Sequence, residues 1–194
     1  VAVTRFGGYA TSVVVPRAQV FPRPAGLGFE AAAGVPAVFA TAWFALFFLA
    51  HPRAGDRVLV HSAAGGVGSS LVQLARRAGC EVTGVVGRPH KVAAARRFGC
   101  DHVIDKSAED LWARAEAIAP EGFDVVLDAN GVATLRGSYA HLRPAGKLVV
   151  YGFASMLSKG RDRPSWPKLA WGWLRTPRFN PLEMTAANKS VLAF

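Results

Sequence analysis

Short apolar runs recur along this chain, and stretches with helical spacing separate them. The runs cover residues 58–62, 81–86, 102–105, 123–128 and 146–152, and residues 190–194 begin a sixth. Helical patterns occupy residues 91–98, 108–118 and 132–142 between them. Valine-rich runs without polar alternation are typical of strands that are buried on both faces of a parallel sheet. The pattern therefore predicts an α/β domain with a doubly wound parallel sheet that helices cover on both faces.

A glycine-rich turn joins the first apolar run to a further helical pattern. The turn reads Ala63-x-Gly65-x-x-Gly68, and apolar residues follow it at helical spacing through residue 78. A strand, such a turn and a helix make up the dinucleotide fingerprint of the Rossmann fold, although alanine stands here in place of the first glycine. Gly65 would let the backbone approach a pyrophosphate, which the amino end of the helix would hold. The sequence predicts a nucleotide site, and the alternative is a plain tight turn.

The end of the second predicted strand indicates which nucleotide to expect. Folds that select NAD carry a carboxylate about 20 residues after the glycines, whereas residues 87–91 read Gly-Arg-Pro-His-Lys. Gly87 leaves room for a 2′-phosphate, and the cations Arg88, Lys91 and Lys106 can neutralise its charge. The alternative is that these are ordinary solvated cations. We expect NADP(H) rather than NAD(H).

The first fifty residues differ from the rest of the chain. Residues 8–15 alternate loosely as a strand and lead into the proline-rich segment 20–24, as at the last edge of a separate β domain. Residues 31–50 carry no charge and are long enough to cross a membrane. Gly34-Val35-Pro36 interrupts this run, and proline disfavours a helical conformation in the residue before it. We therefore expect two short buried helices and no membrane span.

An insert at residues 155–181 separates the last two predicted strands. Its apolar residues Trp166, Leu169, Ala170, Trp173 and Leu174 recur at helical spacing, with Lys168 and Arg175 off the stripe. The stripe predicts a helix that is buried against its own domain or against a second subunit. The alternative is an interfacial helix or lid, over residues 165–175, that touches a membrane or a hydrophobic substrate.

Charge and cysteine content narrow the class of protein. The net charge is +10, and the last 39 residues hold seven basic against two acidic side chains, a balance that raises the question of nucleic acid. No nucleic-acid-binding motif accompanies it, so we expect no such partner. Cys80 and Cys100 lack the spacing of metal ligands, so no metal site is predicted. They are expected to be buried thiols in the cytoplasm rather than a disulfide.

Several of these motifs together resemble one family. The turn at residues 63–68, with residues 101–105 and 146–152, is similar to the zinc-independent medium-chain dehydrogenase/reductases, in the quinone oxidoreductase (zeta-crystallin-like) branch. Residues 5–9 and 178–182 resemble, more narrowly, its synaptic vesicle amine-transport protein-like subgroup. The resemblance implies that residues 27–194 form an NADP(H)-binding Rossmann domain with a truncated sixth strand. It also implies that residues 1–26 are the C-terminal edge of an incomplete GroES-like substrate domain.

The resemblance also implies an activity and a set of site residues. Members reduce a quinone or conjugated carbonyl with NADPH and without a metal, and we assign no catalytic side chain because holding the reactants close together could suffice. Lys106 departs from the tyrosine that relatives often place against the adenine, and Val38 and Phe39 depart from the asparagine and tyrosine of the subgroup. With Arg88 and Lys106 included, the expected cofactor-binding residues are Thr41, Ala63, Ala64, Gly65, Gly66, Val67, Gly68, Gly87, Arg88, Lys91, Lys106, Ala129, Gly152, Phe153 and Ala154.

Two other functions stay open at the level of sequence. The first is a catalytically weak NADPH-binding protein that acts at membranes or with protein partners, which the tryptophan-rich insert motivates. The second is a natural truncated remnant. The family resemblance further implies a homodimer formed through the late strands.

Overall fold

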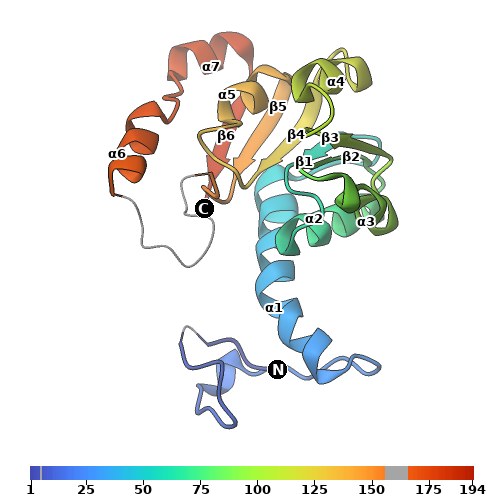
Figure 1. Ribbon diagram of the computed structural model, residues 1–194, viewed down its shortest axis with the longest axis vertical. Coiled ribbons are helices and arrows are strands. Elements are labelled where there is room, and N and C mark those ends of the chain that lie inside the picture. Colours follow the sequence, from blue (N-terminus) through green and yellow to red (C-terminus); the bar gives the residue numbers. More distant parts are fainter. Residues whose placement is uncertain (5, 156–165) are drawn as a thin grey trace.

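The computed structural model describes residues 1–4, 6–155 and 166–194 (Figure 1). Arg5, in the motif at residues 5–9, and residues 156–165 of the insert lie outside the described residues. One parallel sheet has the strand order β3-β2-β1-β4-β5-β6, the order of the doubly wound Rossmann fold. The predicted fold is confirmed. Its strands are β1 (Arg57–Val60), β2 (Glu81–Val86), β3 (His102–Asp105), β4 (Phe123–Asp128), β5 (Leu142–Val150) and β6 (Ser190–Ala193).

Helices cover both faces of this sheet. One face packs against α2, α3 and η2 in a core that includes Leu46, Leu71 and Ala95. The other face packs against α4 and α5 in a core that includes Ala115 and Leu135. The helices are η1 (Arg17–Gln19), α1 (Phe29–Trp43), η2 (Phe44–Ala50), α2 (Gly66–Arg77), η3 (Pro89–Lys91), α3 (Val92–Phe98), α4 (Leu111–Ile118), α5 (Leu135–Ala140), α6 (Trp166–Arg175) and α7 (Pro181–Ala187).

The prediction of two short buried helices at residues 31–50 is wrong. Helix α1 runs through Pro36 and continues directly into the wider π-helical turns of η2. A proline inside a helix removes one backbone hydrogen bond, but the residues on either side of Pro36 keep helical conformation. The helical segment Phe29–Ala50 is long and apolar enough to cross a membrane, and its 18-residue window has a mean hydropathy of 1.9, with 22% of that window buried. Figure 1 shows α1 projecting away from the sheet.

The strand predicted at residues 8–15 is also wrong. This segment is irregular, with bends at residues 9–11, and almost all of it is exposed; in the described part of the N-terminal region the backbone pairs only at an isolated bridge between Ala2 and Val20. A strand requires a neighbour for its backbone donors and acceptors, and residues 8–15 have none here. The segment lies beyond the outer end of α1 (Figure 1).

Strand β5 begins earlier than predicted, at Leu142 instead of residue 146, and α5 is correspondingly shorter than predicted. Leu142 pairs with Phe123, after which the register shifts before Lys147 pairs with Val125. Ala145 adopts a positive φ of 65° at this irregularity. A bulge therefore lets the strand turn around the Pro-Ala-Gly segment that the sequence predicts as a turn.

Candidate cofactor site

The predicted site residues come together at the carboxyl edge of the sheet. Strands β1 and β4 are neighbours in the middle of the sheet, although two other strands separate them in the chain. Their following helices, α2 and α5, pack on opposite faces. An open α/β sheet has its ligand crevice at such a switch point. Except for Thr41 on α1, the expected site residues lie in the segments that follow β1 to β5, and these segments begin at this edge because the strands are parallel.

The glycine turn is closed by contacts between its own backbone groups. The amide of Gly65 donates to the carbonyl of Ser62 at 2.8 Å. A Cβ on Gly68 would overlap that carbonyl oxygen and lie 2.8 Å from its carbon, so only glycine fits there. The left-handed residue of the turn is Ser62, with φ of 56°, and Ala63 does not share that conformation. Alanine can therefore replace the first glycine of the fingerprint.

The amino end of α2 offers donors to an anion. No side chain caps this helix, and the first amide bonded within it is that of Ser69, which donates to Gly65 at 2.8 Å. The amides of Gly66, Val67 and Gly68 precede the first intrahelical bond. Orphan amides and the helix dipole together favour a bound phosphate.

Helix α1 packs on this turn. A Cβ on Gly66 would lie 3.2 Å from Cγ1 of Val38. Val38, which stands where the subgroup has asparagine, therefore places an apolar side chain on the turn. Thr41 lies about one turn further along α1, and its hydroxyl donates to the carbonyl of Ala37 at 2.8 Å. Thr41 therefore lies on the helix beside the turn, and its hydroxyl proton is engaged in a hydrogen bond within that helix.

The expected 2′-phosphate residues gather at the ends of β2 and β3. A Cβ on Gly87 would lie 3.3 Å from Cε of Lys106, so the lysine stem passes over the glycine. Arg88, Lys91 and Lys106 are all exposed, and no ion pair within the described residues engages any of them. Three cations without anionic partners around a glycine suit a phosphate monoester.

The loops after β4 and β5 are hydrogen-bonded to each other. The amides of Ala154 and Ser155 donate to the carbonyls of Ala129 and Asn130, each at 2.9 Å. A Cβ on Gly152 would lie 3.0 Å from the Ala129 oxygen, which explains a glycine there. These contacts place Ala129 and residues 152–154, all expected cofactor-binding residues, in one layer at the switch point.

Asn130 joins this layer to the glycine turn. Its Oδ1 accepts a hydrogen bond from the Ser62 hydroxyl at 3.1 Å. Its Nδ2 is buried and has no partner among the described residues. A buried donor without a partner costs free energy unless a ligand or water satisfies it. The orphan amide, the glycine cradle and the cations therefore fit a dinucleotide in this crevice.

The sequence reasoning missed a buried polar network beneath the turn. The Ser138 hydroxyl donates to Oδ2 of Asp128 at 2.8 Å and lies 3.0 Å from Nε2 of His61. Asp128 also accepts from the Asn130 and Gly131 amides and from the Thr134 hydroxyl. No Ser-His-Asp set was expected from the sequence, yet these three side chains meet. Serine stands between the other two and all are buried, so the set holds loops in place and does not present a nucleophile.

Burial governs the charge of His61. Desolvation lowers the pKa of His61 to about 4, against an opposing effect of Asp128 and with a smaller lowering by Lys106. The imidazole is therefore neutral at pH 7, as its fully buried position requires. Adjacency of the ends of β1 and β4 was the signal that could have linked His61 to Asp128.

The two cysteines are free and buried, as the sequence predicts. Burial raises the pKa of Cys80 to about 11 and that of Cys100 to about 12. Thiols with such pKa values are poor nucleophiles at neutral pH.

The strand order defines this chain as a Rossmann domain, a fold that commonly binds dinucleotides at the switch point. A family model described as "Zinc-binding dehydrogenase" matches residues 66–169, more than half of the chain. The chain belongs to this family. Within the described residues, no group of three or more His, Cys, Asp or Glu side chains could hold a metal ion.

Individual relatives support the narrower resemblance. The chain is 34% identical over 192 residues to the human "Synaptic vesicle membrane protein VAT-1 homolog", which covers 99% of this chain and 48% of that protein. A quinone oxidoreductase from Thermus thermophilus, solved also in complex with NADPH, shares 32% identity with a TM-score of 0.80 and covers all of this chain and 56% of its own. The human VAT-1 homolog-like protein shares 28% identity with a TM-score of 0.76, covering all of this chain and 50% of its own.

These relatives confirm the resemblance to the quinone oxidoreductase branch of the medium-chain dehydrogenase/reductases. The chain spans about half the length of the curated relatives it matches.

Proposed function

We propose that this chain binds NADP(H) and serves a reductase that transfers a hydride to a quinone or conjugated carbonyl. The observation that carries the proposal is the pairing of two features at one edge of the sheet. Gly68 is packed so tightly on Ser62 that only glycine fits. Lys106 passes over Gly87, Arg88 and Lys91 follow it in the chain, and none of these exposed cations has an ion pair among the described residues. The first suits a pyrophosphate, and the second suits the 2′-phosphate that distinguishes NADP(H).

Each expected residue has a task in this proposal. Residues 63–68 and the amino end of α2 would hold the pyrophosphate, and Gly87, Arg88, Lys91 and Lys106 would hold the 2′-phosphate. Ala129, residues 152–154 and the orphan amide of Asn130 would flank the nicotinamide, with Thr41 on the helix beside the turn. The cofactor would supply a hydride, and the chain would orient the acceptor and exclude water from it. A flat electrophile needs no metal in such an arrangement, and solvent would provide the proton.

An assay of cofactor oxidation tests the reductase. NADPH is incubated with the protein and a panel of quinones and enones, and its absorbance is followed over time. At least one acceptor is expected to accelerate oxidation in the wild-type protein and to leave Gly68→Ala at the uncatalysed rate. If no acceptor accelerates NADPH oxidation while NADPH still binds, the reductase proposal is wrong and cofactor binding stands by itself.

A second candidate function is peripheral membrane binding through α6. The exposed fractions of Trp166, Trp173 and Leu174 are 79%, 67% and 67%. The stripe was expected to be buried against its own domain or against a second subunit, and the described chain leaves these three side chains uncovered. Their exposure is also compatible with the alternative of an interfacial helix. Co-sedimentation with anionic vesicles tests it: Trp166→Ser/Trp173→Ser should lose vesicle binding, and Trp43→Ser, at an exposed tryptophan on α1, should retain it. Unchanged binding of the double variant would show that α6 is not the anchor.

We further propose a homodimer through β6. This strand pairs with β5 alone in the described sheet and leaves its other edge open, and an open edge is a template for pairing with another chain. Sedimentation velocity over a concentration series should show a dimer that Val191→Pro converts to monomer. A monomer at every concentration would contradict this assembly. The cytoplasmic location stays a prediction.

A further inference from the structure

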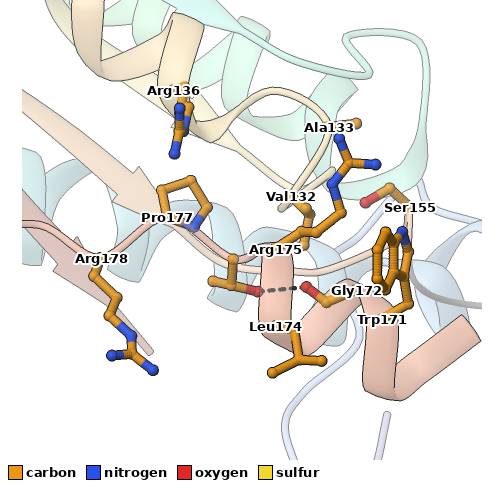
Figure 2. Close-up of a pocket in the computed structure, with 11 residues that line it drawn as sticks. Val132, Ala133, Arg136, Ser155, Trp171, Gly172, Leu174, Arg175, Pro177 and Arg178 are labelled. Carbon is orange, nitrogen blue, oxygen red and sulfur yellow. Dashed lines mark hydrogen bonds between the residues drawn. The ribbon is translucent and has the colours of Figure 1, made fainter.

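A second cavity lies beside the cofactor crevice, under α6. Its volume is about 860 Å³. Its walls come from three separate segments: the start of α5 with the loop before it, Ser155 after β5, and the carboxyl half of α6 with the linker to α7. Figure 2 shows Arg175 extending from α6 toward Ala133 and Ser155. No residue expected to bind the cofactor lines this cavity, so it is a separate feature of the molecule.

The described lining of this cavity is cationic and lacks any acidic residue. It contains Arg136, Arg175 and Arg178, which come from α5, α6 and the following linker. None of the three forms an ion pair or a side-chain hydrogen bond with a described residue, and the guanidinium of Arg175 lies over the Trp171 ring, 5.7 Å from its centroid. Three such cations around one cavity favour a bound anion.

The lining also has an apolar part. Val132, Trp171 and Leu174 contribute side-chain surface next to the arginines. On α6, Trp171 and Arg175 lie about 140° to 180° around the helix from Trp166, at roughly 100° per residue. The helix therefore turns an aromatic and a cation to the cavity, while the exposed Trp166 and Trp173 point the other way. The cavity side of α6 therefore differs from the side that carries Trp166 and Trp173, and Leu174, which belongs to the apolar stripe, lies at the boundary between the two.

We propose that this cavity binds an amphipathic anion, namely a phosphate monoester that carries a short apolar group. The phosphate would lie between Arg136 and Arg175, whose planar guanidinium groups can each donate two hydrogen bonds to it. The apolar group would pack on Trp171 and Val132. A soluble ester and the headgroup of a lipid share this chemistry. The site does not depend on cofactor binding, although Ser155 links the cavity to the nicotinamide loops through its bond to Asn130.

Calorimetric titration of hexyl phosphate into the whole chain tests the proposal. Inorganic phosphate represents the anionic group alone, and hexanol represents the apolar group alone. Each is expected to bind at least about tenfold more weakly than hexyl phosphate, because each lacks one set of contacts. Arg136→Ala/Arg175→Ala should weaken hexyl phosphate about tenfold or more, and Arg175→Lys should weaken it less. Trp171→Ala should reduce the advantage of hexyl phosphate over inorganic phosphate.

A matched control separates this site from the cofactor crevice. Arg88→Ala/Lys106→Ala removes the same charge at the proposed 2′-phosphate position, and it should leave hexyl phosphate binding unchanged. Loss of binding in that control, or unchanged affinity in Arg136→Ala/Arg175→Ala, would overturn the proposal. Vesicles that contain phosphatidic acid distinguish a lipid headgroup from a soluble ester. Vesicle binding that depends on Arg136 and Arg175 supports a headgroup. Binding of hexyl phosphate without binding of vesicles supports a soluble ester. Vesicle binding without hexyl phosphate binding would overturn the cavity as the site.

Discussion

The glycine turn at residues 61–68 and helix α6 are both marked by clear sequence patterns, but the structure treats them differently. In the turn, Gly68 meets the Ser62 carbonyl and Gly65 bonds to it, so each constraint has its partner a few residues away. In α6, the helix forms as predicted, yet its apolar stripe is exposed. Periodicity therefore predicts that a helix forms, whereas it does not say what covers the apolar face.

Burial makes this contrast quantitative. Leu71, Val72 and Ala75 of α2 are fully buried against the sheet, while the exposed fraction of Leu174 on α6 is 67%. Burying a side chain of this size stabilises a fold by about 1.5–3 kcal/mol. Helix α2 therefore contributes to the stability of the domain through its buried side chains. The apolar side chains of α6 contribute little unless another surface covers them.

The same substitution in the two helices gives the largest expected difference. Leu71→Ala should lower the free energy of unfolding by about 2–5 kcal/mol, because it removes contacts in a closed core. Leu174→Ala should change it by less than about 0.5 kcal/mol, as at an ordinary surface position. Urea denaturation measures both. A large loss in Leu174→Ala would mean that α6 is packed more tightly than the contrast allows.

The next largest effect concerns the turn itself. Gly68→Ala should cost about 3 kcal/mol, because the new methyl group overlaps backbone atoms that cannot move independently. Gly34→Ala is the control: nothing lies within 4 Å of a Cβ at this position in α1, and alanine should stabilise the helix by about 0.5–1 kcal/mol. Equal stabilities of the two variants in urea would contradict the close packing of the turn.

A smaller effect is expected from acid. His61 has a folded-state pKa of about 4 against 6.5 in the unfolded chain, mainly because burial disfavours its charge. The unfolded chain therefore binds the extra proton first as the pH falls from about 6.5 to 4, and stability declines over that window. The loss attributable to His61 should be about 2 kcal/mol near pH 4.5.

His61→Gln isolates this contribution. The variant keeps a polar group in the position that faces Ser138 but removes the titration, so its stability should change less between about pH 7 and pH 4.5 than that of the wild type. Paired urea titrations at the two pH values measure the difference. Parallel declines in both proteins would show that other groups, such as the carboxylates, account for the acid sensitivity.

The sequence predicted most of what short-range patterns control. The bounds of β2, β3 and β4 match the predicted runs, because apolar residues there meet both faces of the sheet. The start of β5 was missed, since the shift of register at residues 143–146 depends on pairing with β4. The break expected at Pro36 was wrong because the prediction rested on the local preference of proline, whereas the residues on both sides of it keep the long helix intact.

The buried network was missed for a different reason. His61 and Ser138 are 77 residues apart in the chain and meet only because β1 lies beside β4 with α5 above them. No local spacing carries that information. The glycine and the cations at the cofactor edge could be predicted from the sequence, because Gly87, Arg88 and Lys106 directly follow strands that are easily predicted. The cavity under α6 could not be predicted from the sequence, since its walls come from three segments whose relative placement the pattern does not fix.

Energy transfer from tryptophan to bound nicotinamide, on titration with NADPH and then NADH, tests the central claim most directly. The account predicts saturable binding that is at least about tenfold tighter for NADPH, since charged hydrogen bonds to the 2′-phosphate are absent for NADH. Arg88→Ala/Lys106→Ala should remove this preference, and Arg136→Ala/Arg175→Ala should keep it. Equal affinity for the two cofactors, or binding of neither by the folded chain, would contradict the account.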